Sequence, residues 1–83
     1  MSYRVVQYSN EGRNAFDTAN RFLFTACSHN GSYYRGHVEM RDGGNAHVSS
    51  VFRLSDGANL NRNNRIFEMI AYVAANHIQR REA

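Results

Sequence analysis

The sequence predicts a two-layer α+β domain with the element order β-α-β-β-α, in which a mainly antiparallel sheet carries helices on one face. Two patterns predict it. Residues 32–40 and 45–54 alternate between apolar and polar side chains, as half-buried strands do. Residues 60–80 repeat apolar side chains at the spacing of an amphipathic helix. The chain of 83 residues, 42% of them hydrophobic, is long enough for a single small domain over residues 1–83.

The first third of the chain allows two interpretations. Residues 3–9 are rich in β-forming side chains and predict the first strand, which the polar residues Asn10, Glu11 and Gly12 are expected to end. Apolar side chains then recur at three- and four-residue spacing over residues 14–28, which predicts a helix, although Phe24 lies off that stripe. If residues 21–28 instead form a strand, the Asn-Gly pair at 30–31 joins it to the next one. The fold is then a four-stranded meander with a C-terminal helix. The helix is preferred because its period holds over about a dozen residues.

The two alternating segments predict a hairpin whose register follows from side-chain parity. A three-residue loop at 42–44 pairs Met40 with Ala46 and Val38 with Val48, which brings the apolar side chains together. A two-residue loop would mix apolar and polar faces. We therefore expect the three-residue loop, with a glycine in the left-handed conformation.

The outward row of this hairpin is the predicted partner-binding surface. In the expected register Tyr33 lies opposite Arg53, and the Glu39 carboxylate lies opposite the His47 imidazole. On the inner side, Tyr34 lies opposite Phe52, and Leu54 follows on that same side. Aromatic and arginine side chains on an uncovered sheet can anchor a protein partner or stack on unpaired bases. The predicted partner-binding residues are Tyr33, Arg35, His37, His47 and Arg53.

A second candidate site lies at the start of the last helix, which we expect from about Leu60, with Asn59 or Asn61 as its cap. Arginines in its first turns add positive charge where the helix dipole is already positive, so a bound phosphate or carboxylate would offset an unfavourable charge. The predicted anion-binding residues are Asn61, Arg62 and Arg65.

Composition excludes several classes of protein. A single cysteine, Cys27, cannot build a disulfide framework, and the four histidines lack the spacing of a zinc site, so no metal or cofactor is expected. No catalytic motif is present, and we expect no enzyme. No apolar run approaches the roughly 20 residues of a membrane helix, and no export signal begins the chain. A cytoplasmic protein without membrane contact is the expectation.

These observations predict a non-enzymatic binding protein, a small inhibitor or adaptor whose partner is a protein or a ribonucleoprotein complex. The size and the lack of motifs also fit small phage or mobile-element accessory proteins, including anti-CRISPR inhibitors. The alternative is a module that binds single-stranded RNA or DNA through the open sheet face. A formal charge of +3 predicts only weak non-specific affinity for nucleic acid. A homodimer is a further option, because a domain of this size has a small core.

Overall fold

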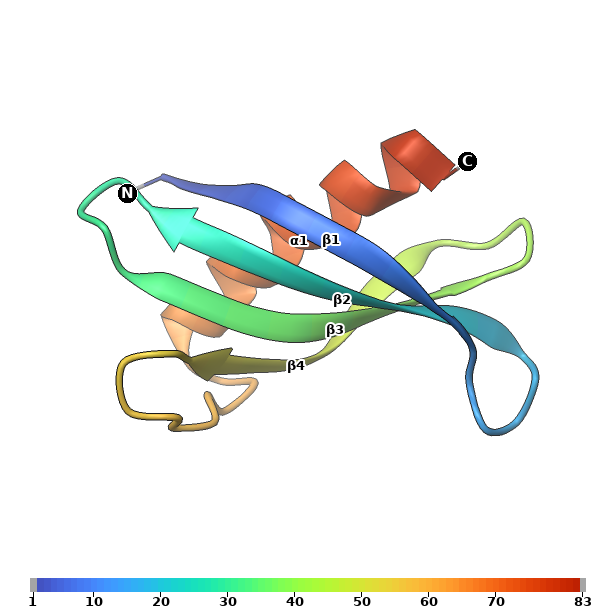
Figure 1. Ribbon diagram of the computed structural model, residues 1–83, viewed down its shortest axis with the longest axis horizontal. Helices are drawn as coiled ribbons and strands as arrows, with labels where there is room; N and C mark the ends of the chain where they lie inside the picture. Colours follow the sequence, from blue (N-terminus) through green and yellow to red (C-terminus); the bar gives the residue numbers. More distant parts are fainter. Residues whose placement is uncertain (1, 83) are drawn as a thin grey trace.

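A computed structural model describes residues 2–82 of the chain, which form four strands and one helix (Figure 1). The strands make one antiparallel sheet in the order β1-β2-β3-β4. The fold is therefore the α+β meander with a C-terminal helix, the alternative of the two predicted folds. The elements are β1 (Tyr3–Arg13), β2 (Ala19–Ser28), β3 (Tyr33–Arg41), β4 (Ala46–Arg53) and α1 (Arg65–Glu82).

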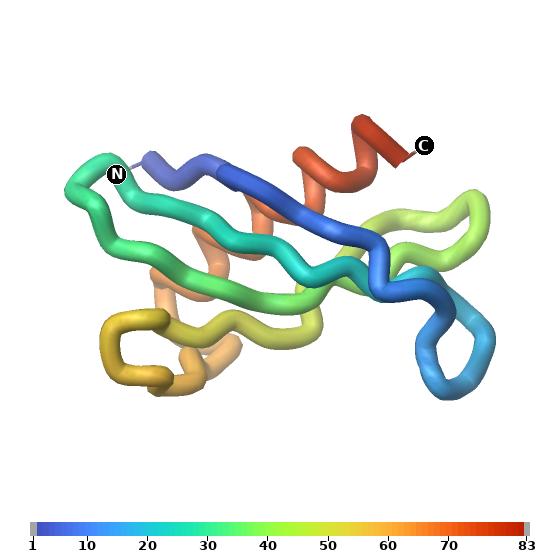
Figure 2. Tube along the Cα trace, viewed as in Figure 1, coloured from blue at the N-terminus to red at the C-terminus, as the bar shows by residue number. Residues whose placement is uncertain are grey.

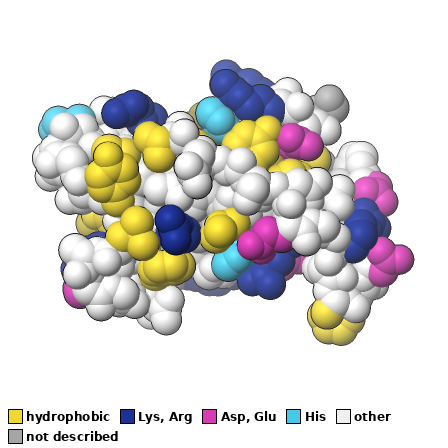
Figure 3. Space-filling model, viewed as in Figure 1, with side chains coloured by type: hydrophobic (Ala, Val, Ile, Leu, Met, Phe, Trp, Pro, Cys, Tyr) yellow, Lys and Arg dark blue, Asp and Glu magenta, His cyan; other side chains and the backbone are white. Residues whose placement is uncertain are grey.

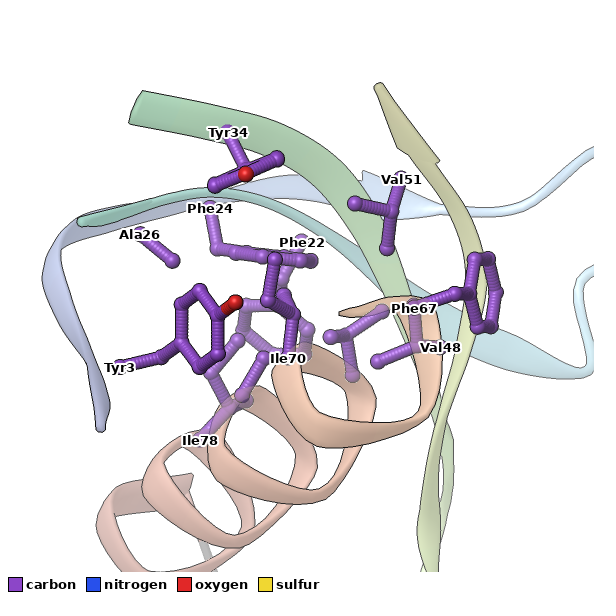
Figure 4. Packing of buried hydrophobic residues seen from close by; sticks show 12 residues of the cluster. Tyr3, Phe22, Phe24, Ala26, Tyr34, Val48, Val51, Phe67, Ile70 and Ile78 are labelled. Atoms are coloured by element: carbon purple, nitrogen blue, oxygen red, sulfur yellow. The ribbon is translucent and has the colours of Figure 1, made fainter. Parts of the chain in front are cut away.

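The helix covers one face of the sheet and leaves the other uncovered by the described chain, as the trace in Figure 2 shows. Its buried side chains recur at three- and four-residue spacing, so they form one stripe that faces the strands. Figure 4 shows side chains of all four strands meeting this stripe. The fully buried large side chains of the core are Phe22, Phe24, Val38, Val51, Ile70 and Ile78.

The predicted helix over residues 14–28 is wrong. Residues 14–18 form a turn, and β2 follows it as an inner strand between β1 and β3. Phe24, which lay off the helical stripe, is fully buried against α1 together with Phe22. The other side of β2 is also covered in part, since Thr25 and Cys27 are less than a tenth exposed. From Phe24 to Ser28 both sides of β2 are buried, so this part of the strand lacks the apolar–polar alternation of a strand with one solvent-facing side, and this explains the error.

The predicted hairpin register is confirmed near the turn and wrong beyond it. Met40 pairs with Ala46 and Val38 with Val48, as parity predicts, and Gly43 in the loop adopts a left-handed φ of 68°. Ser49 is then an extra residue on β4, because His37 pairs with Ser50. This β-bulge shifts every later pair by one residue.

Beyond the bulge, β4 therefore presents different side chains on each side of the sheet. Arg53 pairs with Tyr34 and not with Tyr33, and Phe52 pairs with Arg35. Val51 turns inward and is fully buried in the core. As a result Phe52 lies on the uncovered side of the sheet, where Val51 and Arg53 were expected.

Gly36 makes room for this bulge. A Cβ atom at this position would lie 2.1 Å from the carbonyl oxygen of Ser50 and 2.9 Å from the ring of Phe24. Carbon atoms do not approach so closely, so the bulged strand and the buried ring together require a residue without a side chain.

The helix begins later than predicted, at Arg65 and not near Leu60. Asn64 is its cap, since the Asn64 Oδ1 accepts a hydrogen bond from the amide of Ile66 at 2.8 Å. The expected caps at Asn59 and Asn61 are wrong. The segment before the helix folds back along β4, where the Leu60 amide donates to the Val51 carbonyl at 2.9 Å.

Candidate partner-binding face

The side of the sheet opposite α1 is the candidate site, and we call it the open face. Directly paired residues of antiparallel strands point to the same side, so the pairing decides which side chains share it. Figure 3 looks onto this face. Its paired residues are Arg4, Gln7 and Ser9 of β1, Arg21, Leu23, Thr25 and Cys27 of β2, Tyr33, Arg35, His37 and Glu39 of β3, and His47, Ser50 and Phe52 of β4.

One end of the open face is apolar with a guanidinium among the apolar side chains. Arg35 pairs with Phe52 on one side and Thr25 on the other, and its Nε donates to Thr25 Oγ1 at 3.4 Å. Beside it Tyr33 is 49% exposed and Leu54 is 39% exposed. Figure 3 shows hydrophobic side chains gathered around a basic one in this part of the face. We call this group the Arg35 patch: Leu23, Tyr33, Arg35, Phe52 and Leu54.

The other end of the open face is polar. His37 is half-buried there, with its Nε2 3.4 Å from Glu11 Oε1 and its Nδ1 3.3 Å from Ser50 Oγ. Burial lowers the pKa of His37, the nearby Arg21 guanidinium lowers it further, and Glu11 acts in the opposite direction. The lowered pKa favours the neutral imidazole at neutral pH, and in that form Nε2 can donate a hydrogen bond to Glu11.

The structure brings four of the five predicted partner-binding residues onto the open face: Tyr33, Arg35, His37 and His47. Arg53 is a correction, because the bulge turns it to the helix side, where its Nη1 lies 3.2 Å from Asp56 Oδ2. His47 does lie opposite Glu39, as predicted. The carboxylate of Glu39 nevertheless accepts its hydrogen bond from Asn14 Nδ2, at 3.1 Å.

Sequence reasoning missed three contributors to this face. Phe52 and Leu54 were expected on the inner side, and only the bulge exposes them. The sequence places Glu11 beyond the end of the first strand, whereas β1 continues to Arg13 and carries Glu11 to His37 across β2. The spacing of Phe52 and Leu54 predicts that both side chains lie on one side of the strand, but it does not say whether that side is the core or the open face.

Two of the three predicted anion-binding residues, Asn61 and Arg62, are engaged in contacts of the chain itself. Asn61 Oδ1 accepts a hydrogen bond from the Asn63 amide at 2.9 Å. Arg62 turns back to the sheet, where its Nη2 donates to the Ser49 carbonyl at 3.3 Å and its guanidinium lies 5.8 Å from the Phe67 ring centroid. Arg65 is exposed at the first position of the helix. Arg62 is therefore hydrogen-bonded to Ser49, the extra residue of the bulge.

Acidification should destabilise the fold through His37. Its folded-state pKa lies below the usual 6.5, so the unfolded chain binds the proton more readily than the folded one. Stability is then fully present above pH 6.5 and decreases as the pH falls from there through the folded pKa. We expect the free energy of unfolding, measured by urea titration, to fall between about pH 7 and pH 5, and to fall less steeply in His37→Gln.

His77 should also contribute to the dependence of the free energy of unfolding on pH, because burial and the adjacent Arg81 and Arg80 lower its pKa as well. The His77→Gln variant is therefore the matched comparison, and the double variant should have the shallowest slope. An unchanged slope in His37→Gln would contradict the assignment of a lowered pKa to that imidazole.

Comparison with known proteins gives no relative: the chain matches no family model, and neither a curated protein nor a solved structure is significantly similar to it. Within residues 2–82 no three side chains of His, Cys, Asp or Glu are grouped so that they could hold a metal ion. The helix α1, the one helix of the described residues, is not long and apolar enough to cross a membrane. A proposal about function therefore depends on the geometry of the open face.

Proposed function

We propose that this chain is a non-enzymatic binding protein, an inhibitor or adaptor that docks a protein partner on its open face. The Arg35 patch carries the proposal. Protein interfaces typically combine a small apolar centre rich in aromatic and arginine side chains with a polar rim. Here the centre is the patch, and the rim is formed by polar side chains of β1 and β2, including Arg4, Gln7 and Arg21.

The charge of the open face favours a protein over a nucleic acid. Three arginines, Arg4, Arg21 and Arg35, share it with the carboxylates of Glu11 and Glu39. A phosphate backbone would meet those carboxylates, and affinity for nucleic acid depends mainly on uncompensated cations. Two aromatic rings, Tyr33 and Phe52, could stack on bases, so single-stranded RNA remains the alternative ligand to test.

The polar end of the face supports binding more than catalysis. Ser50, His37 and Glu11 follow one another in the order of a hydrolase triad, but the two contacts are 3.3 and 3.4 Å long. The serine is half-buried on a strand beside the bulge, and an attacking hydroxyl is usually presented on an accessible turn. These three side chains are better suited to fixing the polar rim of an interface.

The test is the triple variant Tyr33→Ala/Arg35→Ala/Phe52→Ala. The partner is first isolated on the wild-type chain from nuclease-treated host lysate and then purified, and its dissociation constant is measured by calorimetry. Because central aromatic and arginine residues each contribute about 2 kcal/mol or more, the variant should bind at least about 100-fold more weakly. The far-ultraviolet circular dichroism should be unchanged, since all three side chains are at least partly exposed.

The matched control is Arg65→Ala, which removes an exposed guanidinium from the first position of α1, away from the open face, and should bind as the wild type does. Equal affinity of the triple variant and the wild type would contradict the proposal. Capture that is lost after nuclease treatment, with affinity for single-stranded RNA that falls steeply with salt, would support the nucleic-acid alternative instead.

A further inference from the structure

The edge of β1 and the side of α1 that runs from Glu68 to Arg81 form a second surface, which we call the ledge. Figure 1 shows the C-terminal end of α1 running past β1, so that helix and strand edge meet at an angle. Two hollows, of about 440 and 390 Å³, follow one another along this line. They share Tyr3, Tyr72 and Val73 as lining residues and therefore form one continuous groove.

The strand that borders the ledge is a sheet edge. Within residues 2–82, β1 pairs with β2 alone. The opposite edge is different, because the segment after β4 returns along it and bonds it at Arg53–Ala58 and at Val51–Leu60. Alternate amide and carbonyl groups of an edge strand point away from the sheet, and they can pair with an added strand. A bulge between Val5 and Gln7 interrupts this edge, and the regular stretch from Gln7 to Asn10 beyond it offers hydrogen bonds to an extended polypeptide.

The groove has an apolar floor at one end. Met69, Tyr72 and Val73 of α1 line the first hollow, and Tyr72 is 74% exposed. An exposed tyrosine beside aliphatic side chains provides a contact for an apolar side chain of a ligand.

The other end of the groove is cationic. Arg4, Arg80 and Arg81 line the second hollow, and no carboxylate is among its lining residues. Of the nearby acids, Glu68 lines the first hollow, and Glu82 accepts a hydrogen bond from the Tyr8 hydroxyl at 2.8 Å. The cations therefore outnumber the acids, and a ligand there should carry negative charge.

We propose that the ledge binds an extended acidic peptide segment of a partner protein, added as a fifth strand beside β1. Its carboxylates pair with Arg4, Arg80 and Arg81, and an apolar side chain packs on Tyr72. This surface shares Arg4 with the open face, so the two are tested separately through residues that belong to one of them alone: Arg80 and Arg81 for the ledge, Tyr33 and Arg35 for the open face. A backbone-pairing edge next to an apolar floor favours a peptide over a nucleic acid, which has no strand to add.

The probe is a fluorescein-labelled peptide of eight residues in which Glu and Val alternate, followed by fluorescence anisotropy. It should bind the full chain, whereas the corresponding Lys/Val peptide should not. Arg80→Glu/Arg81→Glu should weaken binding at least tenfold, and Arg80→Gln/Arg81→Gln should weaken it less. The control Tyr33→Ala/Arg35→Ala changes only the open face and should leave the affinity unchanged.

Strand addition has its own readout in two versions of the peptide that carry N-methyl groups on alternate amides. A strand pairs along one edge only, so one version should lose binding and the other should keep it. Equal binding of both versions, binding unaffected by the charge reversals, or no binding at all would overturn the proposal. Tighter binding of a single-stranded oligonucleotide at the same salt concentration, sensitive to the same reversals, would assign the ledge to nucleic acid and overturn it too.

Discussion

Gly36→Ala should abolish most of the stability of the folded domain. The added Cβ would lie 2.1 Å from the carbonyl oxygen of Ser50, which is backbone and cannot rotate away. The ring of Phe24 lies 2.9 Å from the same Cβ position, so the added methyl group cannot be accommodated on that side either. Over-packing of this severity costs about 3 kcal/mol or more, while a domain of this size has about 3–5 kcal/mol in total. Urea titration should show a much lower midpoint or no cooperative transition.

The matched control is Gly44→Ala in the β3–β4 turn. A Cβ there would lie 3.1 Å from the Arg41 Cβ, at an exposed position with no left-handed φ, so a slight adjustment relieves it. Its midpoint should stay close to that of the wild type. Equal midpoints for the Gly36 and Gly44 variants would contradict the close approach of the bulge to Gly36.

The same bulge limits what the sequence can predict about the open face. Parity fixes the hairpin register near the turn, where Val38 and Val48 leave no choice of side. Ser49 and Ser50 are small and polar and suit either side, so nothing marks the extra residue. Val51 and Phe52 are both apolar, and the alternation cannot tell which of them is buried. Strand β3 pairs in register throughout with β2, and its outward residues, among them Tyr33 and Arg35, are as predicted.

The β1 strand shows a related limit at its far end. Polar residues Asn10 to Gly12 were expected to end it, because Asn and Gly favour turns. On an edge strand such residues can equally remain extended, and β1 continues to Arg13, with irregular pairing between Asn10 and Arg13. The Glu11–His37 contact depends on that continuation, so neither the contact nor the lowered pKa of His37 could be inferred from spacing.

Phe24→Ala should destabilise the fold far more than Leu23→Ala, and this pair decides the structure of the segment that the sequence left ambiguous. A strand sends neighbouring residues to opposite sides. Phe24 is accordingly fully buried against the helix, while Leu23 lies on the open face and is partly exposed. Removing a buried phenylalanine costs about 3–5 kcal/mol, and removing a partly exposed leucine about 1 kcal/mol or less.

A helix over residues 14–28 would reverse this order, because Leu23 lies on its buried stripe and Phe24 off it. Denaturant titration of both variants measures the difference, and Phe24→Leu, a smaller truncation, supplies a value if the alanine variant does not fold. Greater destabilisation by Leu23→Ala would contradict the meander.

Leu23 has a second expected phenotype that Phe24 lacks: as part of the Arg35 patch, its loss should weaken partner binding while the domain stays folded. Stability and binding should thus separate at two adjacent positions of β2, because the strand places one side chain in the core and the next on the proposed interface.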